Sequence, residues 1–162
     1  MDPSVRVDPI YLTGWNGITF DVGGFSNITL GDAGAEYLRG QGADVSFHAA
    51  GSSGWGLMSN SATEAMQGGG YWTIGVDRDQ YIEMDVVAGN MGWEPEAVDE
   101  MKNWLLTSVV KRVDLGVHEA VRQFLETGTV EEITVAISND GVANTTSSGH
   151  IDPFSQEIDR AI

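Results

Sequence analysis

The chain has 162 residues, of which 24 are Asp or Glu and 8 are Lys or Arg, so its formal net charge is −16. A negative charge of this size repels the phosphates of nucleic acids and anionic membrane surfaces, so we expect no nucleic-acid partner. The sequence has no cysteine, which excludes disulfides, thiolate catalysis and cysteine-ligated zinc. It also lacks a run of about 18 apolar residues of the kind that spans a membrane.

The acidic residues are spread along the chain, and only two lysines are present. Dispersed Asp and Glu with scarce lysine favour a surface adapted to high salt, where self-repulsion is screened, although an acidic mesophilic protein would look the same. The N-terminus does not have the charged and apolar regions of a signal peptide. The length fits one domain, or one lobe of a larger protein.

The first half of the chain alternates strand-like and helix-like segments. The predicted elements are a strand over 5–13, a loop rich in glycine and aromatic residues over 17–27, a helix over 28–39, a strand over 44–48, a helix over 55–66 and a strand over 71–76. Strands and helices alternating over short connections are typical of a parallel sheet covered by helices. We therefore predict an α/β fold.

The second half is less regular. Residues 81–104 predict an irregular excursion that ends in a helix over 96–104. A long helix over 109–127 is then predicted, with Thr107 or Ser108 as its N-cap. The remaining predictions are a strand over 130–137 and a terminal helix near Pro153.

The predicted long helix places Lys111 and Arg112 in its first turn, at the positive end of the helix dipole. That position costs a few tenths of a kcal/mol up to about 1 kcal/mol. We expect Asp114, a carboxylate from a neighbouring loop or a ligand to compensate.

Ligands of open parallel sheets bind outside the carboxyl ends of the strands. Three groups are expected at that edge: the loop after Trp15, the turn over 49–54 that contains Gly51, and Asp77. Lys111 would lie on the same rim. These segments predict a single cleft.

Each of these candidates also has a purely structural interpretation. Gly51 and its neighbours offer backbone N–H groups before a helix, but the turn matches no phosphate-loop, dinucleotide or nucleophile-elbow pattern and equally fits a tight turn. Asp77 could accept two hydroxyls of a sugar, or could pair with Lys111 or Arg78. Trp15 and Phe25 flank the glycine-rich loop, where an aromatic ring either stacks on a planar base or simply packs.

Catalytic and metal-binding patterns are weak. Four acidic residues in the region of Asp77 and Asp85 do not have the spacing of a calcium-binding EF-hand. The three histidines are scattered, and no Ser-His-Asp arrangement stands out. We therefore predict no catalytic residue, no metal and no cofactor.

Three segments, in order, resemble successive signatures of one family. They are Gly42–Gly51 (GADVSFHAAG), Ile74–Gln80 (IGVDRDQ) and Leu106–Asp114 (LTSVVKRVD), and Ser138–Val142 resembles the glycine-bearing turn that follows them. The family is the basic membrane protein (BMP) family of substrate-binding lipoproteins, which serve ABC importers and include purine-nucleoside receptors. The resemblance implies a type I periplasmic-binding-protein fold, in which two α/β lobes close on a nucleoside.

The resemblance also implies roles for particular residues. Asp77 and Lys111 match the aspartate and the lysine that hold the ribose hydroxyls. The family has an aromatic residue stacked on the base after the first strand of this lobe. Trp15 follows the strand directly, whereas Phe25 stands at the family's usual distance before Phe47, so both remain candidates.

The family's N-terminal lobe, its signal peptide and its lipidated cysteine have no counterpart in this sequence. We therefore expect residues 1–142 to be part of the C-terminal lobe, and 143–162 to be a polar linker and terminal helix. The full-length protein would be extracytoplasmic, membrane-anchored and partnered by an ABC permease, and half a cleft would bind weakly. Alternatives are a Rossmann-like enzyme acting on a nucleoside or sugar, a ligand-sensing regulatory domain, or a fragment without independent function.

Overall fold

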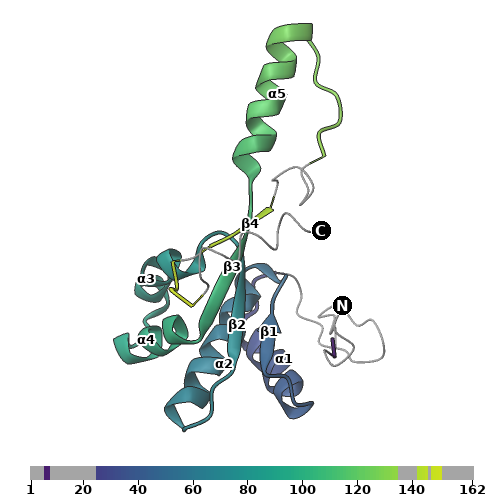
Figure 1. The fold of residues 1–162 in the computed structure, drawn as a ribbon. Helices are drawn as coiled ribbons and strands as arrows, with labels where there is room; N and C mark the ends of the chain where they lie inside the picture. Colours follow the sequence, from purple (N-terminus) through teal and green to yellow (C-terminus); the bar gives the residue numbers. More distant parts are fainter. Residues whose placement is uncertain (1–5, 8–24, 135–141, 146, 151–162) are drawn as a thin grey trace.

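The computed structural model describes residues 6–7, 25–134, 142–145 and 147–150 (Figure 1). In chain order, the elements are α1 (Ile28–Gly40), β1 (Val45–Phe47), the 3-10 helix η2 (Gly51–Ser53), α2 (Gly54–Met66), β2 (Trp72–Asp77), α3 (Gln80–Met91), α4 (Pro95–Asn103), β3 (Leu105–Lys111), α5 (Val113–Thr127) and β4 (Val142–Asn144). The strand predicted over 5–13, apart from 6–7, lies outside the described residues. So do Trp15 and the terminal helix predicted near Pro153.

The four strands form one sheet in the order β1-β2-β3-β4. β1, β2 and β3 run parallel, and β4 pairs antiparallel with β3. The prediction of an α/β fold with a parallel sheet flanked by helices is confirmed. Because parallel strands end at a common edge, the residues that end or follow β1, β2 and β3 lie at one edge of the sheet.

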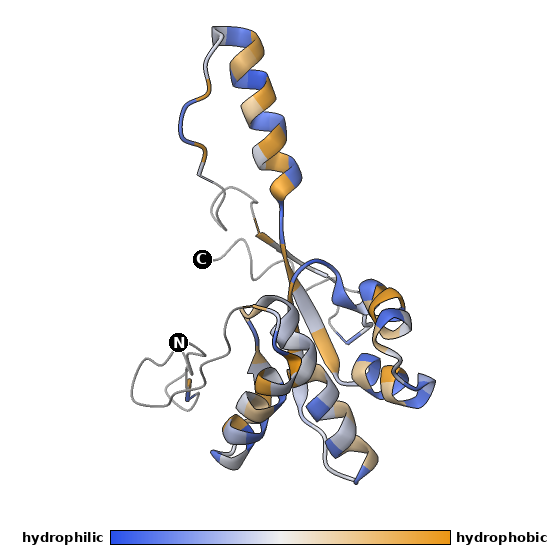
Figure 2. Ribbon diagram, turned by 180° about the vertical axis from the view of Figure 1, so that it is seen from behind, coloured by the Kyte–Doolittle hydropathy of each residue, from blue (hydrophilic) through white to orange (hydrophobic). Residues whose placement is uncertain are grey.

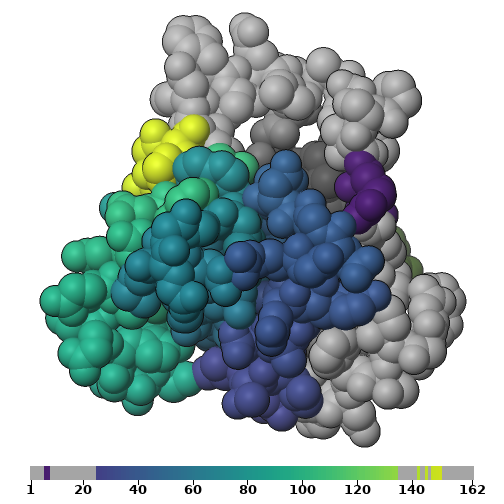
Figure 3. Space-filling model, turned by 90° about the horizontal axis from the view of Figure 1, so that it is seen from below, coloured from purple at the N-terminus to yellow at the C-terminus, as the bar shows by residue number. Residues whose placement is uncertain are grey.

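Helices α1 and α2 lie side by side on one face of the sheet (Figures 1 and 2). Seen from below, α1, α2 and the helices that follow them form one continuous surface (Figure 3). The apolar core lies among α1, α2, α3, α4 and the starts of β2 and β3. Its buried residues are Ala35, Trp55, Leu57, Met58, Ala62, Tyr71, Met84, Ala88, Val98, Met101 and Leu105.

Two glycines set how closely α1 approaches the start of α2. A Cβ atom on Gly31 would overlap the carbonyl of Ser53, and one on Gly56 would overlap the carbonyl of Ile28. Asn27 begins α1 by accepting a hydrogen bond from the Leu30 N–H, at 3.2 Å. This close packing holds the turn after β1 in place.

The prediction of a helix from residue 109 was wrong at its start. Residues 105–111 form β3, and α5 begins only at Val113. β-Branched residues favour a strand where both edges are paired, and β3 lies between β2 and β4. Thr107 and Ser108 are therefore not helix caps, and Lys111 ends a strand. The expected dipole penalty at Lys111 does not arise, and Asp114 occupies the first turn of α5, where a negative charge is favourable.

Three other segments also differ from prediction. The helix predicted over 96–104 is present as α4, but the irregular excursion expected before it is the helix α3, which ends at Gly92 in the left-handed conformation. The described part of the strand predicted over 130–137, residues 130–134, is not a strand. The antiparallel strand β4 was not predicted, and the expected boundary after residue 142 falls inside it.

Helix α5 projects away from the sheet (Figure 1). None of its residues is buried. Apolar residues repeat along it at helical spacing, and in Figure 2 they are the orange segments that recur between blue ones. Val113, Val117, Val121 and Phe124 are 65%, 58%, 53% and 59% exposed. A helix with such a stripe is normally covered by a partner surface.

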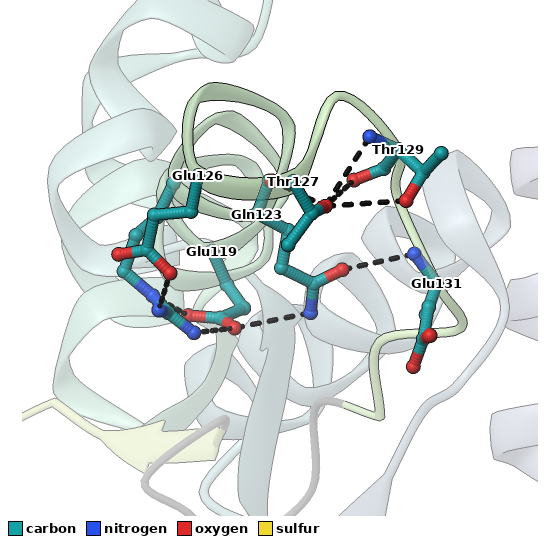
Figure 4. Close-up of polar contacts among 7 residues, drawn as sticks. Glu119, Gln123, Glu126, Thr127, Thr129 and Glu131 are labelled. Atoms are coloured by element: carbon teal, nitrogen blue, oxygen red, sulfur yellow. Dashed lines mark hydrogen bonds and ion pairs between the residues drawn. The ribbon is translucent and has the colours of Figure 1, made fainter.

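The other side of α5 is polar (Figure 4). Arg122 pairs with Glu119 at 2.5 Å and with Glu126 at 2.6 Å. Hydrogen bonds from Arg122 are the main cause that lowers the pKa of Glu119 to about 2. Gln123 donates to Glu119 and accepts from the backbone N–H of Glu131, so the segment after α5 folds back along the helix.

Candidate functional site

The candidate site lies where the three parallel strands end. Asp77 is the last residue of β2, and Lys111 is the last residue of β3. Gly51 follows β1 after a short connection and begins η2. The structure therefore brings these three predicted site residues to one edge of the sheet.

Asp77 and Lys111 form an ion pair across β2 and β3, with Lys111 Nζ at 2.5 Å from Asp77 Oδ1. Asp77 Oδ1 is buried and has no hydrogen-bond partner among the described residues, so the contact lacks hydrogen-bond geometry. The side chains are 63% and 44% exposed for Lys111 and Asp77. Solvent therefore reaches the ammonium group and the rest of the carboxylate, which leaves donors and an acceptor available to a hydroxyl-bearing ligand.

The neighbouring cations are engaged elsewhere. Arg78 pairs with Glu83 at 3.1 Å, and Arg112 pairs with Asp114 at 2.8 Å. Of the partners considered for Asp77 from sequence, Lys111 is the one the structure selects. Lys111 therefore pairs with a carboxylate at the end of the neighbouring strand β2, and Asp114 pairs with Arg112.

The backbone of Asp77 is unusual. Its φ is +71°, and it is the only non-glycine residue with a positive φ in the described part of the chain. The carbonyl of Val76 accepts a hydrogen bond from the N–H of Arg78, at 2.9 Å. A bond between residues i and i+2 around a positive φ is the pattern of a classic γ-turn, which is rare and strained. Strained residues of this kind cluster at functional sites.

Gly51 and Phe25 lie together beside this edge. Gly51 has a φ of +54°, and a Cβ atom there would lie 2.9 Å from the Cβ of Phe25. The Phe25 carbonyl accepts from the N–H of Ser53, and Ser53 Oγ accepts from the N–H of Asn27 at 2.9 Å. Phe25 is 72% exposed, so its ring is available for stacking. Trp15, the other aromatic candidate, lies outside the described residues.

A buried polar cluster that was not predicted from sequence lies directly beneath Asp77. His48 Nε2 and Gln80 Oε1 are 3.0 Å apart, and both residues are 4% exposed. Burial is the largest cause that lowers the pKa of His48, against the opposing effects of the Gln80 hydrogen bond and the Asp77 charge. His48 is therefore neutral near pH 7 and donates from Nε2 to Gln80. The cue in the sequence is the position of Gln80 three residues after a strand-end aspartate.

A hollow beside α5 lies away from this edge. It has a volume of about 450 Å³ and lies between α5 and the segment after it. Its lining includes Glu119 and Glu132 but no lysine or arginine. A second hollow of about 220 Å³ lies between α3 and α4. Neither contains Asp77 or Lys111, and we place the candidate site at the sheet edge because the strained turn and the ion pair are there.

The described residues contain no cluster of three or more histidine, aspartate or glutamate side chains arranged to hold a metal ion. Within the same residues, no helix is both long enough and apolar enough to cross a membrane.

Residues 18–159 match the family model described as Bmp, ABC transporter substrate-binding protein PnrA-like. The chain belongs to this family. Among curated relatives, the CD4+ T-cell-stimulating antigens of Listeria monocytogenes and Listeria innocua are each 34% identical over 97 residues, which is 59% of this chain and 25% of theirs. The Bmp chain described here thus spans about a quarter of the length of these relatives.

A solved structure of an ABC transporter solute-binding protein from Aeropyrum pernix has the same fold. It superposes with a TM-score of 0.56 at 21% identity, covering 85% of this Bmp chain and 33% of that protein. The likeness shows the fold of a solute-binding protein. The family that the sequence motifs indicated is confirmed by the match of residues 18–159 to the family model.

Proposed function

We propose that this chain is the lobe of an ABC-importer substrate-binding protein that holds the ribose of a nucleoside, with a purine nucleoside as the favoured ligand. The observation that carries the proposal is the pairing of Asp77 with Lys111 at the carboxyl edge of the sheet. Family membership supports solute binding without catalysis. The nucleoside assignment comes from the resemblance of the Asp77 and Lys111 segments to those of purine-nucleoside receptors, and the chemistry of the site supports it.

A ribose offers two neighbouring hydroxyls, each of which both donates and accepts a hydrogen bond. The free part of the Asp77 carboxylate can accept from one hydroxyl, and the ammonium of Lys111 can donate to another. The two side chains already lie in contact, so ordering them costs little entropy on binding. The exposed ring of Phe25 supports stacking on a base at the same edge.

We also propose that a second lobe forms the other side of the ligand-binding cleft. The chain leaves the sheet directly after Lys111 and returns at Val142, which pairs with Lys111 in the register of β3 and β4. Helix α5 lies within this excursion, with its apolar stripe uncovered by the described residues. This chain covers a third of the solved solute-binding protein. These facts support an N-terminal lobe that packs on the apolar stripe of α5 and closes over the Asp77–Lys111 pair.

On this proposal the whole protein works outside the cytoplasm, is held at the membrane by a lipid anchor and passes its nucleoside to an ABC permease. A half-site that is open to solvent buries only part of a ligand, so on this proposal closure by the second lobe supplies the remaining contacts.

The proposal is tested by thermal shift with adenosine, guanosine and inosine, and with ribose and the free bases as comparators. A ligand at 100 times its Kd stabilises the folded state by about 2.7 kcal/mol. We expect nucleosides to raise the melting temperature, and ribose or free bases to raise it less. Because one lobe binds weakly, the assay is repeated on the protein that includes the N-terminal lobe. Absence of a nucleoside-selective rise in both forms would refute the proposal.

A further inference from the structure

We infer that Gln80 is the positioning residue of the candidate site: it fixes the strained turn that aims Asp77 at Lys111 and at the ligand, without touching the ligand itself. This inference rests on the proposed function, because it assigns a role toward the ribose. Asp77, a non-glycine residue, is held at a φ of +71°. Such a conformation persists only where its surroundings impose it.

The side chain of Gln80 supplies that constraint from below the turn. Its Oε1 accepts a hydrogen bond from the backbone N–H of Val76, the residue before Asp77, at 3.2 Å. The same oxygen accepts from His48 Nε2, which follows β1, at 3.0 Å. One buried oxygen therefore ties the end of β1 to the end of β2.

The backbone of Gln80 makes the third connection. Its N–H donates to Ser108 Oγ on β3, at 3.1 Å, and Ser108 is fully buried. Gly75 leaves room for this arrangement, because a Cβ atom there would overlap both Gln80 Oε1 and Ser108 Oγ. Gln80 thus joins the ends of β1 and β2 to the middle of β3, and the turn that carries Asp77 lies between the two attachment points at Val76 and Gln80.

Asp79 fixes the other end of the turn that carries Asp77. Its carboxylate caps α3 by accepting from the N–H of Tyr81 at 3.2 Å, and it also contacts the hydroxyl of Ser147. Buried contacts of Gln80 thus fix the turn before Asp77, and the helix-capping contact of Asp79 fixes it after Asp77. The Asp77 side chain is then held toward Lys111. Without the Gln80 oxygen, the Val76 N–H would be buried without a partner, and the turn would relax toward an ordinary negative φ.

The test compares Gln80→Leu, which removes the acceptor at similar volume, with Gln80→Glu, which retains an oxygen at the same reach. The measured quantity is the ratio of the Kd for a 2′,3′-dideoxynucleoside to the Kd for the matching nucleoside. We expect Gln80→Leu to reduce this ratio about tenfold, the loss of one well-placed hydrogen bond to a charged group. We expect Gln80→Glu to retain most of the wild-type ratio. Ser61→Ala, which removes the buried bond from Ser61 Oγ to the Tyr71 carbonyl at the far end of β2, is the control for lost stability alone.

A purely structural role for Gln80 would weaken both ligands equally and leave the ratio unchanged, and that result would overturn the inference. If the wild-type protein itself does not distinguish the two ligands, the proposed function fails instead. In that case the intraresidue HN–Hα NOE of Asp77, which is strong only at a positive φ, is measured by NMR without ligand and decides the positioning role. A weaker NOE in Gln80→Leu but not in Gln80→Glu supports it, and an unchanged NOE in both variants contradicts it.

Discussion

Replacing Lys111 by alanine separates the ligand-binding role of this residue from its role in folding. The Lys111 and Asp77 side chains are 63% and 44% exposed, so their ion pair is screened by solvent. Exposed pairs of this kind contribute about 0–1 kcal/mol to the free energy of unfolding. A hydrogen bond from a charged group to a bound hydroxyl is worth about 1.5–3 kcal/mol. Lys111→Ala should therefore change stability little and raise the Kd for a nucleoside about 10- to 150-fold.

Calorimetric titration with a nucleoside gives the Kd, and urea unfolding gives the stability. The chain offers a matched control, because its only other lysine, Lys102, also forms an ion pair, with Asp85 at 2.6 Å. Lys102 lies on α4, and its ammonium is 5.3 Å from the centre of the Tyr81 ring. Lys102→Ala makes the same change in net charge and should leave the nucleoside Kd unchanged. Equal affinities for wild type and Lys111→Ala, or equal losses in the two variants, would refute the assignment of Lys111.

Three further predictions concern the fold around the site. Gly54→Ala should lower the free energy of unfolding by about 1–3 kcal/mol in urea titration, because the added Cβ overlaps the buried ring of His48; an unchanged midpoint would contradict the packing. Burial lowers the pKa of His48, so the unfolded chain binds a proton at this histidine more readily than the folded chain. The free energy of unfolding should therefore fall as the pH drops below about 6.5, and this fall should be smaller in His48→Gln. Melting temperatures of wild type and His48→Gln that fall equally with pH below that value would refute the prediction. Val121→Glu should barely change the stability of this chain alone, since Val121 is 53% exposed, yet lower the melting temperature of the protein that includes the N-terminal lobe; an equal effect in both proteins would argue against a lobe on α5.

The sheet edge was predictable from local pattern. Short β-rich segments followed by glycine-containing turns predicted β1 and β2, and strand ends in parallel sheets predicted where Gly51 and Asp77 would lie. The ion pair between Asp77 and Lys111 was among the alternatives considered. Its geometry depends on β2 and β3 being neighbours, which the sequence alone does not state.

The misassignment of β3 has a clear physical cause. Valines at 110, 113, 117 and 121 fit a helical repeat, and that periodicity extends from α5 backward into a segment that is a strand. Pairing with β2 and β4 overrides the periodicity, since it satisfies the backbone of β3 on both edges. Helix α3 was not predicted because Gly89 and Asn90 are poor helix formers. In the structure, the cap at Asp79 and the burial of Met84 in the core outweigh that weak local preference.

The cluster of His48, Gln80 and Ser108 was beyond local pattern. These residues come from three elements that are distant in sequence, and each has a common structural explanation when read alone. Only their convergence beneath a strained turn gives them a shared role. The apolar stripe of α5 was visible as a repeat, but its exposure, and hence its need for a partner surface, required the structure.

The central claim is that the Asp77 carboxylate accepts hydrogen bonds from the ribose hydroxyls of a nucleoside. A double-mutant cycle tests it most directly, with wild type and Asp77→Asn each titrated calorimetrically with a nucleoside and with its 2′,3′-dideoxy analogue. We predict a coupling energy of at least about 1 kcal/mol between the carboxylate and the hydroxyls. A coupling energy of zero, with both ligands affected equally by Asp77→Asn, would contradict it.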